Sequence, residues 1–311
     1  MQRLIGHYTG QERGTLIIAL AAMHGNEPAG IRALRTLFQM LEDEPKRNAG
    51  FEFRGRLVGL VGNVQAYERR LRYVKKDLNR LMTLENLKKA RLTPQSRLIY
   101  EDLELVELTQ TIKNEIIEYK PSRLVILDLH TTSASGGIFT IVSDDNECID
   151  LATQLNAPVV LGMIGNTGGT TLHYFKTENM GVPTVTIGFE AGQHEDALSV
   201  QRTIAWLVNV LRAVKSVEPY DVESRHDMIL KNYSRYLPKL VDLFYVHHIQ
   251  ASDHFQMREG FKNFQEIKAG EILADDKNGE IVASDDCLLL MPLYQRQGTE
   301  GFFLVKDKTH R

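Results

Sequence analysis

Short apolar runs alternate with longer amphipathic segments through the first two thirds of the chain, and this alternation limits the choice of fold. Strand-length apolar runs occupy residues 16–22, 56–61, 124–127, 138–142, 158–161 and 184–187. Apolar residues recur at helical spacing over residues 29–41, 103–119, 149–155 and 197–214. Strands that alternate with helices build sheets covered on both faces. The pattern therefore predicts an α/β fold with a mixed, mostly parallel sheet flanked by helices.

The pattern changes near residue 218. Beyond it, short strand-like runs are separated by glycines, and Asn278-Gly279 predicts a β-hairpin. A chain of 311 residues is long enough for about two domains. We expect a larger α/β domain over residues 1–218, which carries the candidate site described below, and a smaller β-rich C-terminal domain over residues 219–311.

The charge balance excludes some classes of partner. The chain has 37 basic and 40 acidic residues, a formal net charge of -3. Proteins dedicated to nucleic acid or to membrane surfaces are usually basic, so we expect neither partner. Cys148 and Cys287 are the only cysteines, too few for a disulfide framework or a cysteine zinc site. The prediction is a cytoplasmic protein.

His24 and Glu27 follow the first apolar run and precede the first helical segment. Residues three apart in a helix or turn face the same way, so both side chains can reach one metal ion. A histidine nitrogen and a carboxylate oxygen are two of the three ligands of a His-His-Glu zinc site. The spacing alone is weak evidence, because an unrelated turn histidine beside a helix-start glutamate is common.

His130 lies at the end of another apolar run, with Asp128 two residues before it. Ligands of open α/β sheets bind at the carboxyl ends of the strands, where both histidines fall. Asp128 is a candidate to orient a histidine ligand. The alternative is a hydrogen-bonded histidine that closes a strand without a metal.

Glu190 closes a third apolar run, between Phe189 and Ala191. Partial burial raises a carboxyl pKa and suits the group to general-base catalysis. In the loop before the second helical segment, Asn79 and Arg80 offer an amide and a planar guanidinium fork, which suit a substrate carboxylate. Arg72 offers positive charge for a developing oxyanion. The alternative for Arg72, Asn79 and Arg80 is an ordinary solvated loop. The alternative for Glu190 is a strand-end glutamate paired with a lysine.

Taken in order, four segments resemble the succinylglutamate desuccinylase/aspartoacylase family, which is related to the zinc carboxypeptidases. They are His24-Gly25-Asn26-Glu27, the Arg72–Arg80 segment, Asp128-Leu129-His130-Thr131-Thr132 and Gly188-Phe189-Glu190-Ala191-Gly192. The resemblance covers most of residues 15–215 and continues weakly through residues 291–303.

The resemblance implies a role for each of these residues. His24, Glu27 and His130 would hold one Zn²⁺ per chain. Glu190 would be the general base, Arg72 would stabilise the oxyanion, and Asn79 with Arg80 would hold an α-carboxylate. A homodimer is also implied by the resemblance.

Two departures bear on the substrate. The aspartoacylase branch has an arginine that grips the aspartate side chain, and the matching residues 170–176 contain none. Where that branch has a substrate-contacting tyrosine, this chain has Glu300-Gly301-Phe302. Both departures count against N-acetylaspartate.

The expected function is zinc-dependent hydrolysis of the amide bond of a small N-acyl amino acid, giving a carboxylate and a free amino acid. One alternative is a carboxypeptidase or amidase that acts on a short peptide or another acylated amine. A lid formed near Tyr294 would count against the peptide. The second alternative is a zinc-containing binding protein without catalysis, which has no need of Glu190 and Arg72 together with three ligands.

Overall fold

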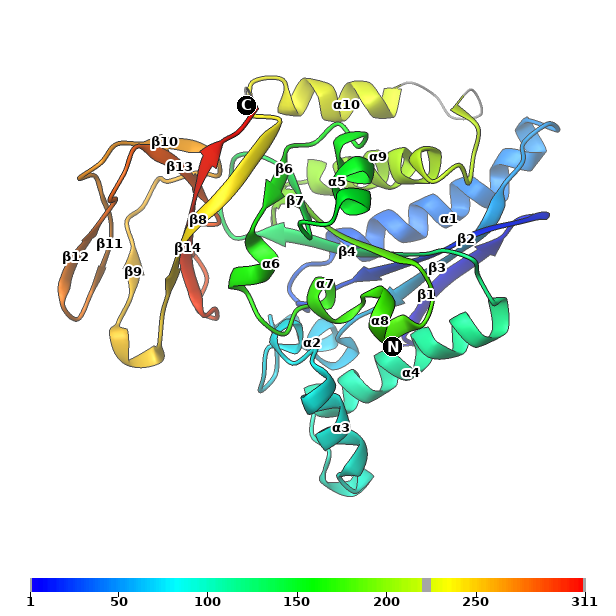
Figure 1. Ribbon diagram of the computed structural model, residues 1–311, viewed down its shortest axis with the longest axis horizontal. Coiled ribbons are helices and arrows are strands. Elements are labelled where there is room, and N and C mark those ends of the chain that lie inside the picture. Colours follow the sequence, from blue (N-terminus) through cyan, green and yellow to red (C-terminus); the bar gives the residue numbers. More distant parts are fainter. Residues whose placement is uncertain (1, 220–224, 310–311) are drawn as a thin grey trace.

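The computed structural model describes residues 2–219 and 225–309, and its main feature is an eleven-stranded mixed sheet (Figure 1). From edge to edge the strands are β1 (Leu4–Thr9), β3 (Arg54–Val61), β2 (Glu12–Ala21), β4 (Leu124–Thr132), β7 (Thr184–Gln193), β5 (Phe139–Val142), β6 (Val159–Leu161), β8 (Leu240–His248), β14 (Glu300–Asp307), β13 (Cys287–Leu290) and β10 (Gln265–Ile267). Between β3 and β8, neighbours pair in parallel except for β7 and β5. The predicted α/β fold class is confirmed.

Helices cover both faces of the sheet, as Figure 1 shows. One face carries α1 (Ala29–Arg47), α5 (Asn146–Thr153), α9 (Leu198–Ala213) and α10 (Arg225–Ser234). The other carries α3 (Leu84–Leu92), α4 (Glu101–Tyr119), α7 (Thr171–Tyr174) and α8 (Thr177–Met180). Successive residues of β2 explain this layering: Ile17 packs under α1 and Leu16 under α4. Because alternate side chains of a strand face opposite ways, an apolar run buries both faces.

Shorter elements connect these layers. They are α2 (Val64–Arg69), the 3₁₀ turns η1 (Leu78–Arg80) and η2 (Gln95–Arg97), and α6 (Met163–Asn166). The sequence pattern predicted none of them, and it also missed β1, α3 and α10. Pro28 takes the N-cap position of α1, and residues 24–27 before it form a separate turn.

The aromatic core behind the central strands is tightly packed. Phe189 of β7 stacks on Trp206 of α9, with ring centroids 4.8 Å apart. The Trp206 indole N–H donates to the Thr140 hydroxyl at 3.1 Å. Trp206 is fully buried. This packing fixes α9 against β7 at Phe189, the residue directly before Glu190.

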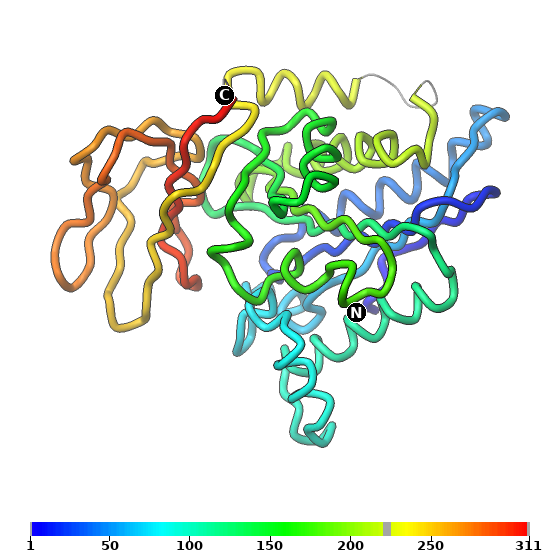
Figure 2. Tube along the Cα trace, viewed as in Figure 1, coloured from blue at the N-terminus to red at the C-terminus, as the bar shows by residue number. Residues whose placement is uncertain are grey.

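The C-terminal part of the chain is rich in strands and lies at one end of the molecule, coloured yellow to red in Figure 2. A second sheet there contains β9 (Gln256–Met257), β11 (Ile272–Asp276) and β12 (Gly279–Val282), beyond the 3₁₀ turn η4 (Ala251–Asp253). β11 and β12 form the hairpin predicted at Asn278-Gly279. The large sheet continues past residue 218, because β8 pairs with β6. The domain boundary at 218 stays a prediction, and residues 220–224 beside it lie outside the described residues.

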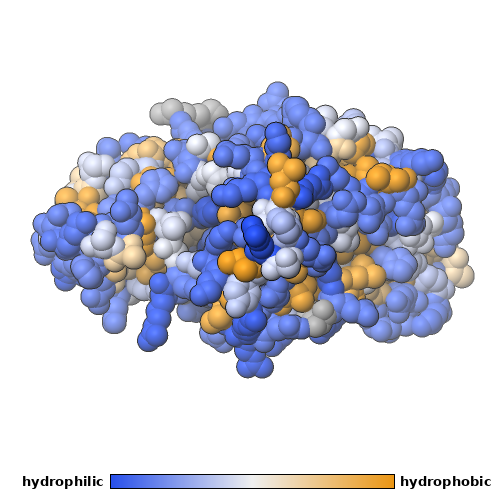
Figure 3. Space-filling model, turned by 90° about the horizontal axis from the view of Figure 1, so that it is seen from below, coloured by the Kyte–Doolittle hydropathy of each residue, from blue (hydrophilic) through white to orange (hydrophobic). Residues whose placement is uncertain are grey.

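The surface in Figure 3 is mainly hydrophilic, with apolar side chains scattered in small groups. Large exposed apolar residues come from many separate elements, among them Leu92 of α3 and Ile117 of α4. Within residues 2–219 and 225–309, no helix combines the length and apolarity that crossing a membrane requires.

Candidate metal centre and active site

The candidate site lies at the carboxyl ends of three adjacent strands, β2, β4 and β7. His24 and Glu27 come from the turn after β2, closed by a hydrogen bond from the Glu27 N–H to the His24 carbonyl at 3.1 Å. Gly25 lets this turn pass close to α2, because a Cβ atom there would lie 2.1 Å from the Ala66 carbonyl carbon. His130 and Glu190 face each other as register partners in β4 and β7.

Three buried side chains converge on one point. The Glu27 carboxylate lies between the two rings, with Oε1 2.9 Å from His24 Nδ1 and Oε2 3.0 Å from His130 Nδ1. One ligand atom from each residue lies within 4.8 Å of the others. Two imidazole nitrogens and a carboxylate oxygen match the protein ligands of a catalytic zinc site, which keeps a fourth position open.

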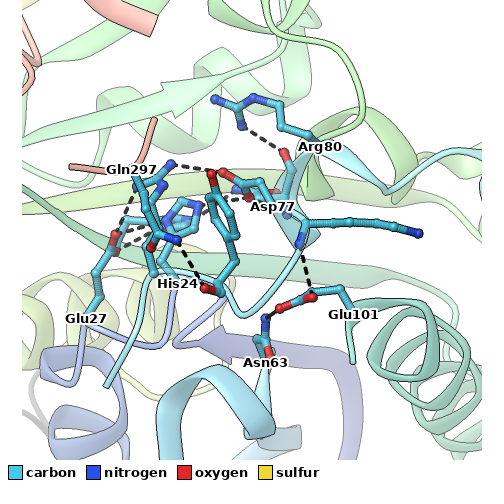
Figure 4. Close-up of polar contacts among 12 residues, drawn as sticks. His24, Glu27, Asn63, Asp77, Arg80, Glu101 and Gln297 are labelled. Atoms are coloured by element: carbon cyan, nitrogen blue, oxygen red, sulfur yellow. Dashed lines mark hydrogen bonds and ion pairs between the residues drawn. The ribbon is translucent and has the colours of Figure 1, made fainter. Parts of the chain in front are cut away.

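A carboxylate behind each histidine fixes its ring. His24 Nε2 lies 3.2 Å from Asp77 Oδ1, and His130 Nε2 lies 3.0 Å from Asp128 Oδ2. Figure 4 shows Glu27 and Asp77 on either side of His24. When the outer nitrogen donates to a carboxylate, the inner Nδ1 is free to bind a metal. Sequence reasoning identified Asp128 but gave Asp77 no role, although Asp77 lies inside the quoted Arg72–Arg80 segment.

The surroundings of Glu27 also bear on whether these residues could bind a dipositive metal ion. Burial opposes its ionised form, yet the neighbouring His24 and His130 hold the pKa of Glu27 well below its usual range. A buried carboxylate placed between two ring-oriented histidines supplies a suitable ligand set for zinc. These residues therefore fit the metal that the resemblance implies.

Glu190 reaches the same cavity from β7 and is 5% exposed. Its Oε2 atom is buried without a hydrogen-bond partner among the described residues. Burial is the main reason that the pKa of Glu190 is raised to about 8; His130 opposes the rise, and the negative charges of Glu27 and Asp128 contribute to it. An unpartnered carboxyl oxygen in a cavity is available to exchange a proton with a ligand.

Arg72 lies in the loop before η1 and lines the same cavity. Its guanidinium is 3.2 Å from Asp77 Oδ2 and 3.9 Å from Glu27 Oε1. The loop is fixed by Glu101, whose buried carboxylate accepts backbone N–H groups of Val74, Lys75 and Lys76 at 2.7, 3.1 and 3.2 Å. Figure 4 shows Glu101 between this loop and Asn63. Sequence reasoning missed Glu101, because a glutamate at the start of a helix gives no sign in the sequence that it will bind a loop elsewhere in the chain.

Asn79 and Arg80 lie in η1 and line the cavity, but their polar groups already have partners in the protein. The Asn79 side-chain oxygen accepts the Thr171 N–H at 2.9 Å. The Arg80 guanidinium donates to both carboxylate oxygens of Glu300, from Nε at 3.1 Å and from Nη2 at 2.7 Å. The substrate-binding role predicted for both residues remains a prediction.

Polar and apolar side chains line the cavity together. The candidate ligands, Glu190 and the two arginines contribute to the lining, as do the apolar residues Ile141, Met163 and Leu172. The C-terminal part contributes Met291, Leu293, Gln295, Gly298, Glu300 and Phe303. Gln295 accepts a hydrogen bond from the Asn26 amide at 3.1 Å, which ties this segment to the turn after β2.

A comparison with known protein families gives a match over residues 13–214 to the succinylglutamate desuccinylase/aspartoacylase catalytic domain. The matched range contains all eight residues assigned a role from the sequence. The chain belongs to this family.

Similarity to individual family members is low in sequence and extensive in structure. A Nostoc sp. protein named "Probable aspartoacylase" is 29% identical over 130 residues, which is 42% of this chain and 40% of that protein. The chain thus matches less than half the length of that curated relative.

Solved structures cover more of the chain. Succinylglutamate desuccinylase from Vibrio cholerae has 16% identity and a TM-score of 0.60, covering 95% of this chain and 82% of its own. The ectoine utilization protein from Ruegeria pomeroyi, solved with product bound, has 17% identity and a TM-score of 0.63, covering 97% and 87%. Murine aminoacylase 3 has 17% identity and a TM-score of 0.57, covering 95% and 96%. These similarities establish the shared fold.

Proposed function

We propose that this member of the family is a zinc-dependent amidohydrolase that removes the acyl group from a small N-acyl amino acid. The observation that carries the proposal is the unpartnered Glu190 oxygen in the same buried cavity as the His24, Glu27 and His130 ligand atoms. Histidines that serve only to stabilise the fold do not require a neighbouring carboxylate without a hydrogen-bond partner, whereas a catalytic site does require a group that can accept a proton. The names of the relatives, which include an aspartoacylase and desuccinylases, support an acylated amino acid as the starting class.

His24, Glu27 and His130 would hold one Zn²⁺ per chain. When bound, zinc supplies a Lewis acid that lowers the pKa of a water molecule to about 7 and polarises a carbonyl group. Asp77 and Asp128 hold the histidine rings so that both Nδ1 atoms point toward Glu27, where they would be available to the ion.

The remaining steps belong to side chains of the protein. Glu190 takes a proton from the attacking water as the water oxygen bonds to the amide carbon. It then gives that proton to the nitrogen as the C–N bond breaks, which releases a carboxylate and an amine. Arg72 lies beside Glu27 and offers positive charge to the carbonyl oxygen while its negative charge develops.

Three alternatives to this proposal are a carboxypeptidase, an amidase that acts on another acylated amine, and a binding protein without catalysis. The segment near Tyr294 that would limit peptide access contributes Leu293 and Gln295 to the cavity wall, which argues against a carboxypeptidase. Another acylated amine gains support from the pairing of Arg80 with Glu300. A binding protein without catalysis would leave the buried Glu190 carboxyl without a purpose. Cytoplasmic location and a homodimer stay predictions.

The test is an amide-hydrolysis screen on metal-replete protein, with bound zinc quantified in the same sample. N-acetyl, N-formyl and N-succinyl derivatives of amino acids and of simple amines form the panel. We expect turnover that a chelator abolishes and added zinc restores. One equivalent of zinc with no turnover across the panel would contradict the proposal and favour the binding protein.

A further inference from the structure

Five apolar side chains lie in the lining of the cavity, and the proposed reaction gives them no role. They are Ile141 of β5, Met163 of α6, Leu172 of α7 and, from the C-terminal part, Met291 and Phe303. All of them except Leu172 belong to one apolar cluster, which joins the two parts of the chain. We call these five residues the apolar patch.

Gly188 lets Leu172 approach the rest of the apolar patch. A Cβ atom at Gly188 would lie 3.4 Å from Cδ1 of Leu172 and 3.7 Å from Cβ of Ile141. Gly188 lies two residues before Glu190 on β7, and alternate residues of a strand face the same way. Leu172 and Ile141 therefore meet over the face of β7 that carries the proposed general base.

The segment that carries Leu172 packs on η1, the turn proposed to bind the substrate α-carboxylate. The Thr171 N–H donates to the side-chain oxygen of Asn79 at 2.9 Å. A Cβ atom at Gly169 would lie 2.1 Å from the Arg80 carbonyl oxygen, so the two backbones are in contact there. Leu172 is thus held next to the residues that would bind the amino-acid half of the substrate.

Arg80 can bind a substrate carboxylate while it stays paired with Glu300. It makes two hydrogen bonds to Glu300 and one to the Asn79 carbonyl, and a guanidinium has further N–H donors beyond these. The side chain of an amino acid branches from the carbon that bears the α-carboxylate. With the α-carboxylate at Arg80, that side chain would lie beside Leu172.

The cations of the cavity already have roles in the proposed reaction. Among the described residues that line it, the basic side chains are His24, His130, Arg72 and Arg80. The histidines would hold the metal, and Arg80 the α-carboxylate. Arg72 keeps a buried Nε atom without a partner among the described residues, which suits it to the oxyanion. A second carboxylate, on the substrate side chain, would meet the apolar patch without a cation assigned to it, at a high desolvation cost.

We infer that Leu172 is a specificity-determining residue and that the apolar patch binds the side chain of the substrate. The substrate is then an N-acyl amino acid with an aliphatic side chain, such as that of leucine. The inference rests on the proposed amide hydrolysis and narrows its substrate class.

The first experiment compares N-acetylleucine, N-acetylasparagine and N-acetylaspartate on the zinc-loaded, full-length protein. The three side chains have the same branching and the same number of heavy atoms, so they differ in polarity and charge rather than in shape. We expect kcat/KM to favour N-acetylleucine over N-acetylasparagine by roughly tenfold or more, because burial of an aliphatic side chain gains about this factor. N-acetylaspartate should be the poorest of the three, because its charge would be buried.

Variants of the patch test which residue sets this preference. Leu172→Asn keeps the branching of the side chain and should lower the ratio of kcat/KM for leucine over asparagine by roughly tenfold. Leu172→Met should keep the wild-type preference. Met163→Gln exchanges an apolar for a polar side chain elsewhere in the patch and serves if Leu172→Asn folds poorly.

One further variant controls for indirect effects. Leu92→Asn makes the same exchange at an exposed residue of α3 and should leave the ratio unchanged. Zinc content and Tm are measured for every variant.

The second experiment measures binding without turnover. Free leucine and free asparagine are titrated calorimetrically into the zinc-loaded proteins. We expect leucine to bind roughly tenfold more tightly than asparagine to the wild type, and this difference to shrink in Leu172→Asn.

Equal binding of leucine and asparagine would overturn the inference. A preference for N-isovalerylglycine over N-acetylglycine would then assign the apolar patch to the acyl group instead. Absence of turnover on every substrate would contradict the proposed function, and the leucine titration would still decide what the patch binds.

Discussion

Glu190 combines burial, nearby negative charge and a free carboxyl oxygen, and its role can be tested by changing one atom. In Glu190→Gln the side chain keeps its shape but can no longer accept a proton. We expect zinc binding to persist and kcat to fall by about 10²-fold or more. Steady-state kinetics and metal analysis on the same sample measure both effects. Glu178→Gln, an exposed glutamate of α8, is the matched control. A kcat within a few-fold of wild type would exclude general-base catalysis by Glu190.

Asp128 contacts His130, a proposed metal ligand, so we expect the loss of its carboxylate to lower zinc affinity before it alters the chemical step. Asp128→Asn keeps the volume but weakens the hydrogen bond that fixes the ring of His130. We expect zinc affinity to fall by roughly 10- to 100-fold. Competition with a chromogenic chelator measures this affinity. If affinity stayed at the wild-type value, the orientation of His130 would have to come from elsewhere, such as the neighbouring Asn79.

At the scale of elements, strands and long helices were predictable where local patterns were strong. β2, β4 and β7 are buried on both faces, so each appears in the sequence as a continuous apolar run. Parallel strands end at the same edge, which is why His24, His130 and Glu190 were expected together. Short elements such as α7 and η1 have too few residues to show a period.

Contacts between distant segments were not predictable from local pattern. Glu101 begins α4 yet holds the loop over residues 74–76. Glu300 begins β14 yet meets Arg80 in η1. Both glutamates resemble ordinary charged residues at the start of an element. Tertiary packing, which a single sequence does not display, gives each its role.

The loop held by Glu101 provides a test at this scale. Glu101→Ala removes the acceptor for three backbone N–H groups and for the Asn63 amide. The Asn63 amide is buried, and a buried donor left without a partner costs about 1–3 kcal/mol. With the partly buried loop amides added, we expect the free energy of unfolding to fall by about 2 kcal/mol or more. Activity should fall as well, because Arg72 and Asp77 lie on this loop.

Denaturant unfolding and kinetics check the two effects of Glu101→Ala. Glu107→Ala, a more exposed glutamate on the same helix, is the control. A variant with wild-type stability would mean that water replaces the carboxylate at little cost.

At the scale of the whole molecule, the eleven-stranded sheet continues across the predicted domain boundary at residue 218. β8 continues the sheet from β6, and Leu230 of α10 packs in the same core as α9. We therefore expect the complete chain to unfold in a single calorimetric transition.

Removal of residues 219–311 should be harmful for the same reason. The fragment 1–218 would expose the edge of β6 and the apolar face of α9, so we expect it to aggregate or to melt at least about 10 °C lower. A fragment with the Tm of the complete chain would instead support two independent domains.

The packing of α9 on β7 also gives the protein an optical reporter. Trp206 is the single tryptophan of the chain, so all indole fluorescence comes from one known place. Its ring is buried against Phe189, the residue before Glu190. Emission at short wavelength would mark an intact core, and a red shift would mark entry of water there. Unlabelled protein thus carries its own probe of β7, the strand that contains Glu190.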